Sequence, residues 1–267
     1  MNVGWEDRYE TLRFERRGRV LTIVFNDPDR LNAVGSRMHH ELGRVFLDAG
    51  DDPDSDIIVL TGAGRAFSAG GDADRIQEIA ARPASFLDDI TSAKRIVFSL
   101  LDLEKPIIAK INGPAVGLGA TIALFCDVTF MADTAKIGDP HVSVGLVAGD
   151  GGAVIWPQLV GFSKAKEILM AGELLDAAKA LSLGLVNHAV PAAELDRTVD
   201  AYCDRLAGGA TNAIRWTKVA INLELKRIAH AIMDAGIAYE ALSAHSAHHA
   251  EAASAFLRKR GWKSGDK

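Results

Sequence analysis

The fold is decided by one segment of the chain, Lys105-Pro106-Ile107-Ile108-Ala109-Lys110-Ile111-Asn112-Gly113-Pro114-Ala115-Val116-Gly117-Leu118-Gly119. Residues 107–111 are apolar except for Lys110 and mostly β-branched, which predicts a strand. The glycines that follow permit positive φ angles and a close approach of the backbone to a ligand. The apolar run over residues 118–126 then predicts a helix. The segment is therefore a strand, a glycine loop and a helix in succession.

The same order recurs in the first part of the chain. Residues 20–25, 57–60 and 128–131 predict strands, Ser36 predicts the N-cap of a helix that reaches about residue 49, and residues 86–103 have helical spacing. A second glycine loop, residues 62–72, follows the strand at 57–60 and leads into another helix. Because the recurrence has no fixed period, a solenoid is excluded and stacked β-β-α units are predicted.

Helical patterns dominate the rest of the chain. They cover residues 163–171, 176–183, 193–206, 212–223, 225–245 and 249–260, with one short strand at 185–190. No low-complexity linker separates the two parts. We therefore predict an α/β core over residues 1–195 and a helical C-terminal extension over residues 196–267.

Composition excludes several classes of protein. The 267 residues have a formal net charge of −5 and are 48% hydrophobic, which is close to the average for globular proteins. There is no overall excess of basic residues for a nucleic-acid partner, and no apolar run is long enough to predict a membrane span. The two cysteines form no CxxC pattern, and the first residues do not resemble a signal peptide, so a cytoplasmic protein is predicted.

The glycine loops do not match common nucleotide or nucleophile motifs. Phe67 stands where a dinucleotide fingerprint requires Gly or Ala, and neither loop contains Gly-Lys followed by Ser or Thr. Ser68 follows Ala66 at a spacing where a nucleophile elbow requires Gly. Two roles for the glycine loops remain: close packing of the backbone, or binding of an anion at the start of the helix that follows each loop.

A group of three histidines and a pair of one His and one Asp are candidates for chemistry. His245, His248 and His249 lie near Glu251, but without an HExxH pattern a solvated helix face is favoured over a metal site. His141 and Asp150 lie in a glycine-punctuated loop, residues 138–152, before an apolar helix. Asp150 is a candidate both for catalysis and for capping that helix.

Taken together, these motifs resemble the crotonase (enoyl-CoA hydratase/isomerase) superfamily. The resemblance rests on both glycine loops, on Cys126-Asp127, and on residues 145–152, 177–186 and 255–260 in this order, and it spans about residues 10–260. It implies a spiral of β-β-α units whose C-terminal helices form a trimer or a dimer of trimers. It also implies an acyl-CoA thioester as the substrate, without a metal or a separate cofactor.

The resemblance further implies the residues of the site. The backbone N–H groups of Gly71 and Leu118 would form an oxyanion hole for the thioester oxygen. Further substrate contacts are implied at Ala66, Ala69, Gly70, Asp72, Gly117, Thr121, Phe256 and Lys259. The last two would approach CoA from the same or a neighbouring subunit.

The sequence departs from the family pattern at the acid/base groups. Thr121 and His141 stand where typical hydratases carry two glutamates. His can act as a base near neutral pH, whereas Thr cannot. Relatives such as dienoyl-CoA isomerases and chlorobenzoyl-CoA dehalogenase carry a catalytic Asp in this later loop, close to Asp150. His141 and Asp150 are therefore a candidate replacement pair, with Asp150 held ionised by the helix dipole.

These residues leave four activities open. The first is a lyase of the enoyl-CoA hydratase type, and the second is an enoyl-CoA or dienoyl-CoA isomerase. The third is a catalytically silent oligomer that binds CoA thioesters. The fourth is a hydrolytic or dehalogenating variant with Asp150 as the nucleophile.

Overall fold

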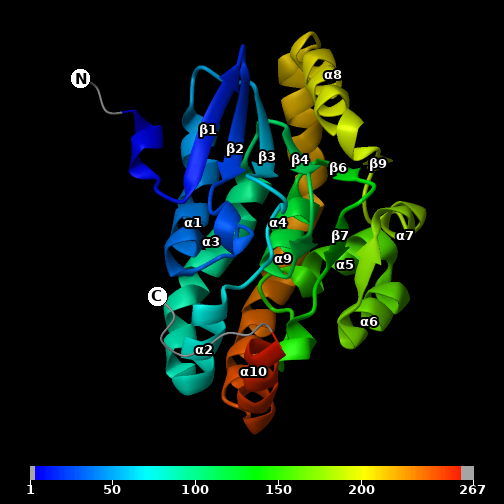
Figure 1. Ribbon diagram of the computed structural model, residues 1–267. Helices are drawn as coiled ribbons and strands as arrows, with labels where there is room; N and C mark the ends of the chain where they lie inside the picture. Colours follow the sequence, from blue (N-terminus) through cyan, green and yellow to red (C-terminus); the bar gives the residue numbers. More distant parts are fainter. Residues whose placement is uncertain (1–3, 260–267) are drawn as a thin grey trace.

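The computed structural model describes residues 4–259. Its main sheet has six strands in the order β1-β2-β3-β4-β6-β9, in which β1 is antiparallel to β2 and the other neighbours are parallel. The strands are β1 (Leu12–Arg17), β2 (Val20–Phe25), β3 (Ile57–Gly62), β4 (Ile107–Ile111), β6 (Val128–Ala132) and β9 (His188–Val190). In Figure 1 these strands stand side by side in the upper half of the molecule. A sheet of parallel strands with intervening helices confirms the predicted α/β class.

A smaller sheet and the helices complete the molecule (Figure 1). This sheet contains β5 (Ala115–Val116), β7 (Lys136–Gly138) and β8 (Leu174–Asp176). The α-helices are α1 (Ser36–Asp51), α2 (Ala73–Ala81), α3 (Ile90–Asp102), α4 (Leu118–Phe125), α5 (Gly152–Val160), α6 (Phe162–Ala171), α7 (Ala177–Ser182), α8 (Leu195–Ala207), α9 (Thr211–Ala244) and α10 (Ala247–Lys259). Short 3-10 helices are η1 (Trp5–Arg8), η2 (Pro28–Arg30), η3 (Pro83–Asp89), η4 (His141–Val144) and η5 (Ala192–Glu194).

Several sequence predictions differ from the structure in detail. The N-cap of α1 is Gly35, and Ser36 is the first helical residue. The helical spacing at 86–103 covers two elements, because Pro83 starts the 3-10 helix η3 and α3 begins only at Ile90. The two helices predicted at 212–223 and 225–245 are the single helix α9, since no Pro or Gly interrupts the chain near residue 224.

The C-terminal helices pack against the core. Helix α8 contacts β3, β4 and β6, and α9 contacts α3 and α5. Helix α10 folds back onto α2 and η4, as the lower part of Figure 1 shows. Helices α8, α9 and α10 make up most of residues 195–259, and the predicted division into two domains at residue 195 stays a prediction. No helix within residues 4–259 is long and apolar enough to cross a membrane.

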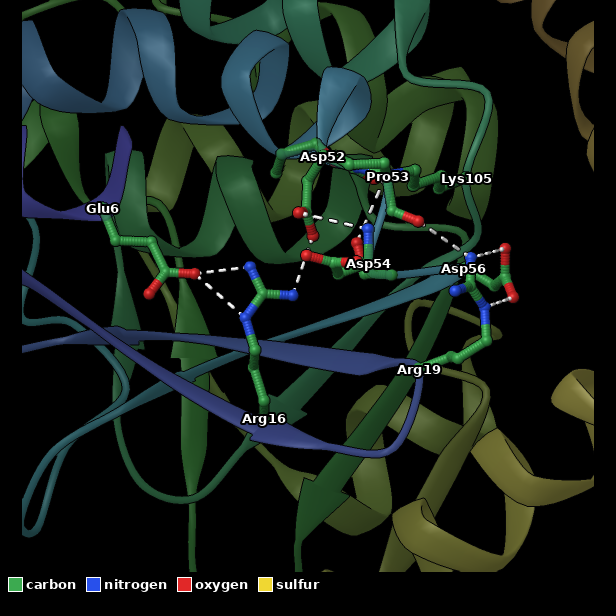
Figure 2. Close-up of polar contacts among 10 residues, drawn as sticks. Glu6, Arg16, Arg19, Asp52, Pro53, Asp54, Asp56 and Lys105 are labelled. Carbon is green, nitrogen blue, oxygen red and sulfur yellow. Dashed lines mark hydrogen bonds and ion pairs between the residues drawn. The ribbon is translucent and has the colours of Figure 1, made fainter. Parts of the chain in front are cut away.

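A buried lysine anchors α1 to the sheet. Figure 2 shows Lys105 near Asp52 and Asp56, and Arg16 reaching from β1 to Glu6 and Asp52. Lys105 Nζ donates to the carbonyl oxygens of Ala49 and Asp52 and to the hydroxyl of Ser55. The ammonium group therefore pairs oxygens at the C-terminal end of α1 that would otherwise be buried without donors.

Replacing Lys105 by Met is expected to destabilise the fold. The carbonyl oxygens at the end of α1 lose their donor, which costs about 1–3 kcal/mol of the free energy of unfolding. Urea denaturation followed by circular dichroism measures this difference. The exposed Lys166 provides a matched control, because Lys166→Met should leave the unfolding midpoint nearly unchanged. Equal midpoints for both variants would contradict the anchoring role.

Candidate active site

The two glycine loops lie side by side. Val116 N donates to Ser68 O at 2.9 Å, which joins the second loop to the first. Gly70 and Gly117 have φ angles of 80° and 55°, which favour glycine. A Cβ atom on Gly70 would lie 2.6 Å from Val116 O, so the loops approach too closely for any side chain there.

The amides of Gly71 and Leu118 are available for a ligand. Leu118 is the first residue of α4, where a backbone N–H has no partner within its own helix. Neither amide donates a hydrogen bond within the described part of the chain. Both residues line one cavity of about 410 Å³. Ala69, Gly70, Gly117, His141, Asp150 and Phe256 line the same cavity.

His141 lies at this cavity among three carboxyl groups. It opens η4, and its Nδ1 atom is hydrogen-bonded to the carboxylate of Asp139. Its Nε2 atom lies 3.5 Å from Asp150 Oδ2 and 3.8 Å from Glu240 Oε1. The side chains of Asp139, Asp150 and Glu240 are 0%, 10% and 5% exposed. The structure therefore brings His141 and Asp150 together and adds two further carboxyl groups.

Glu240 and Asp139 were missed by the sequence analysis. Glu240 comes from α9, almost one hundred residues after His141, so its contact with the loop is long-range. A signal was present, because the buried residues Met233, Gly236, Ile237, Glu240 and Ala244 share helical spacing. An acidic residue on such a buried face requires a partner or a function.

Each of the three carboxyl groups keeps an oxygen for a further contact. Asp139 Oδ2, Asp150 Oδ1 and Glu240 Oε2 are buried and have no hydrogen-bond partner among residues 4–259. Leaving buried carboxyl oxygens unpaired is costly. Asp150 and Glu240 also line the cavity, so a substrate or a water molecule there would reach them.

Burial and the neighbouring charges shift the pKa values of the cluster. Burial raises the pKa of Asp150 to about 6, although the charge of His141 opposes the shift. Burial, and then the charge of Asp150, raise the pKa of Glu240 well above its usual value. Burial lowers the pKa of His141, but the charges of Asp139, Asp150 and Glu240 outweigh it and raise this pKa well above 6.5. His141 therefore favours its cationic form and Glu240 its protonated form more strongly than the free side chains do, and Asp150 is mostly ionised above pH 6.

The interpretation of Asp150 as a helix cap is wrong. Helix α5 begins at Gly152, its N-cap is Gly151, and no side chain caps it by a hydrogen bond. The expected stabilisation of the ionised form by the helix dipole is also outweighed, since burial raises the pKa of Asp150 instead. Asp150 is thus poised to gain and lose a proton near neutral pH.

Of the other predicted site residues, some line the cavity and some do not. Thr121 is fully buried on α4, Asp72 is the N-cap of α2 and forms an ion pair with Arg30, and the Ala66 carbonyl accepts from Asn32. None of these three is among the residues that line the cavity. Phe256 lines it from α10 of the same chain, whereas Lys259 is exposed and does not.

The histidines at the C-terminal end have a structural contact. His249 is fully buried and its Nδ1 atom is 2.6 Å from Val144 O, which ties α10 to η4.

Asp139, His141 and Asp150 are close enough to hold one cation, because their ligand atoms lie within 4.8 Å of one another. Both ring nitrogens of His141 face carboxyl groups, and this arrangement favours sharing of a proton over metal binding.

The main sheet of mostly parallel strands, with its two adjoining glycine loops, is the α/β architecture of the crotonase fold. The chain belongs to the enoyl-CoA hydratase/isomerase family, whose model matches residues 15–266.

Relatives support both the fold and the family. A Mycobacterium tuberculosis protein named "Probable enoyl-CoA hydratase" is 35% identical over 257 residues, covering 94% of this chain and 96% of the relative. The structure of an enoyl-CoA hydratase/isomerase from Mycobacterium paratuberculosis has a TM-score of 0.88 and 33% identity, covering 92% of this chain and 99% of the other. A β-diketone hydrolase from Anabaena, solved with (S)-3-oxocyclohexyl acetic acid, has a TM-score of 0.84 and 28% identity, covering 91% and 98% of the two chains.

Proposed function

We propose that the protein adds water to the double bond of an α,β-unsaturated acyl-CoA thioester. The observation that carries this proposal is the pair of cavity-lining carboxyl groups, Asp150 and Glu240, which face Nε2 of His141 and whose pKa values are both raised by burial. Hydration requires a base to activate water and an acid to protonate the α-carbon. Two carboxyl groups of raised pKa beside one imidazole, one of them ionised and the other protonated, meet both requirements.

Each group has a defined part in the reaction. Ionised Asp150 takes a proton from water, and the water oxygen bonds to the β-carbon of the substrate. The electrons of the double bond move to the thioester oxygen, where the amides of Gly71 and Leu118 stabilise the enolate. The enolate re-forms the carbonyl as its α-carbon takes the proton from Glu240. Protonated His141 keeps Asp150 ionised and is held in place by Asp139.

Purified enoyl-, dienoyl- and aryl-CoA thioesters test this activity by mass spectrometry. We expect a gain of one water by an enoyl-CoA and no effect of prior dialysis against EDTA, since we propose no metal or separate cofactor. A shifted double bond without a mass change would instead identify an isomerase, which needs only one proton shuttle. No change in any thioester would contradict both activities.

Hydrolysis of a β-diketone is a second candidate. It is favoured by the likeness to the Anabaena β-diketone hydrolase, which has a TM-score of 0.84. Water activated by Asp150 would attack one carbonyl carbon, and the bond from this carbon to the central carbon would break. The oxyanion hole would hold the resulting enolate, and Glu240 would protonate its carbon, so the products are a carboxylic acid and a ketone. Incubation with cyclic and linear β-diketones, followed by mass spectrometry, separates this reaction from hydration.

We propose a homotrimer or a dimer of trimers as the assembly. Helix α9 exposes large apolar side chains, including Trp216, Ile221, Leu223, Tyr239 and Leu242, which are 63–67% exposed in the single chain. Such an apolar surface is typical of an interface between subunits. Sedimentation velocity is expected to show three or six chains of 28.5 kDa, and a monomer at micromolar concentration would contradict the proposal.

A further inference from the structure

A second polar group lies on the wall of the same cavity. His39 from α1, Arg75 from α2 and Asp89 from η3 line the cavity together with apolar residues such as Ile76, Ile79 and Phe86. None of these polar residues belongs to the cluster around His141. Their hydrogen bonds define which kind of ligand they accept.

The hydrogen bonds of His39 favour one tautomer. Ser92 Oγ donates to Asp89 O at 3.1 Å, and this contact leaves it to accept from His39 Nδ1 at 2.8 Å. With the proton of the neutral imidazole on Nδ1, Nε2 presents a lone pair. Burial lowers the pKa of His39, and the charges of Arg75 and His40 add to this effect, although Asp89 opposes it. No hydrogen bond reaches Nε2 from the residues the structure describes.

Arg75 has no donor left for an anionic ligand. Its Nε and Nη2 atoms both donate to Asp89 Oδ2, and Nη2 also donates to Ser85 O. The other terminal nitrogen donates to Glu78 and to Ser85 Oγ. These contacts use all five N–H groups of the guanidinium. Two carboxylates also outweigh its single positive charge, so this wall disfavours a carboxylate or a phosphate.

We propose that this wall is a subsite for a hydroxyl group on the acyl part of the substrate, which donates a hydrogen bond to Nε2 of His39. The inference rests on the proposed function, since it takes the cavity as the acyl-binding site. A neutral donor satisfies the lone pair of His39, whereas a carbonyl group or an alkyl chain leaves it unpaired. The protein therefore selects thioesters whose acyl chain carries a hydroxyl beyond the reacting carbons.

Pairs of acyl-CoA thioesters, with and without a hydroxyl at successive positions beyond the β-carbon, test the subsite. Saturated pairs give affinities by isothermal titration calorimetry without turnover, and unsaturated pairs give kcat/KM. At one position the hydroxylated compound is expected to be favoured by about 10- to 100-fold in both measurements. If no position gives a preference, the subsite is excluded even when turnover is observed. A preference in binding without turnover of any thioester would instead contradict the proposed function alone.

Three variants connect the preference to His39. His39→Leu should abolish it, and His39→Gln, which retains an acceptor oxygen, should keep part of it. The neighbouring His40 is exposed and does not line the cavity, so His40→Leu should leave the preference unchanged. An undiminished preference in folded His39→Leu would overturn the assignment. If His39→Leu does not fold, loss of the preference in His39→Gln would overturn it, because the acceptor is still present.

Discussion

Replacing Asp150 by Asn is expected to lower kcat by about 10²–10⁴ while the affinity for the acyl-CoA thioester changes little. The amide is similar in size to the carboxylate but cannot take a proton from water. The pKa of about 6 makes the native carboxylate a suitable base near neutral pH. Single-turnover kinetics on the best substrate, with affinity measured separately by calorimetry, checks this result.

Related variants and the pH profile distinguish the groups of the cluster. His141→Ala and Glu240→Gln should each lower kcat by a similar factor, whereas Asp196→Asn, at an exposed ion pair with Lys110, should not. Activity should fall as the pH drops through about 6, because Asp150 gains a proton and ceases to act as a base. It should fall again at higher pH, when Glu240 loses its proton. Near-normal rates in Asp150→Asn and His141→Ala would remove this pair from the mechanism.

The sequence predicted the elements that carry a strong local pattern. Strand β2 was predicted at the residues it occupies, since a continuous apolar and β-branched run indicates a buried strand. Strand β1 was not predicted, because its residues Leu12-Arg13-Phe14-Glu15-Arg16-Arg17 are mostly charged. It is an edge strand held by pairing with β2 and by the ion pair of Arg16 with Asp52, which only the fold brings together.

The candidate site was predicted only where its residues are near in sequence. His141 and Asp150 lie in one loop, so their proximity could be anticipated. Glu240 reaches them only because α9 packs against α5 and places its buried face at this loop. The charge state of Asp150 could likewise be predicted only as far as it depends on residues near in sequence. A helix dipole was visible in the sequence, but the burial and the neighbouring carboxyl groups that raise the pKa of Asp150 were not.

Replacing Leu118 by Pro is expected to lower kcat by about 10²–10³, because it removes one of the two proposed oxyanion donors. The first residue of a helix is where proline is best tolerated, since its N–H bonds nothing in the helix. Leu118 is this residue of α4, and its amide has no partner in the described part of the protein. The helix should therefore form, and stopped-flow kinetics of the folded variant measures the loss of the donor.

The side chain of Leu118 requires a separate control, because it is only 6% exposed and lines the cavity. Leu118→Ala removes this side chain and keeps the amide, so its kcat should stay within about tenfold of the native value, with the change mainly in KM. Loss of the leucine side chain weakens binding of the substrate and the transition state alike, so it raises KM in both variants. Loss of the oxyanion donor lowers kcat, and it occurs in the proline variant alone. Equal kcat values for Leu118→Pro and Leu118→Ala in folded proteins would show that this amide does not stabilise the enolate.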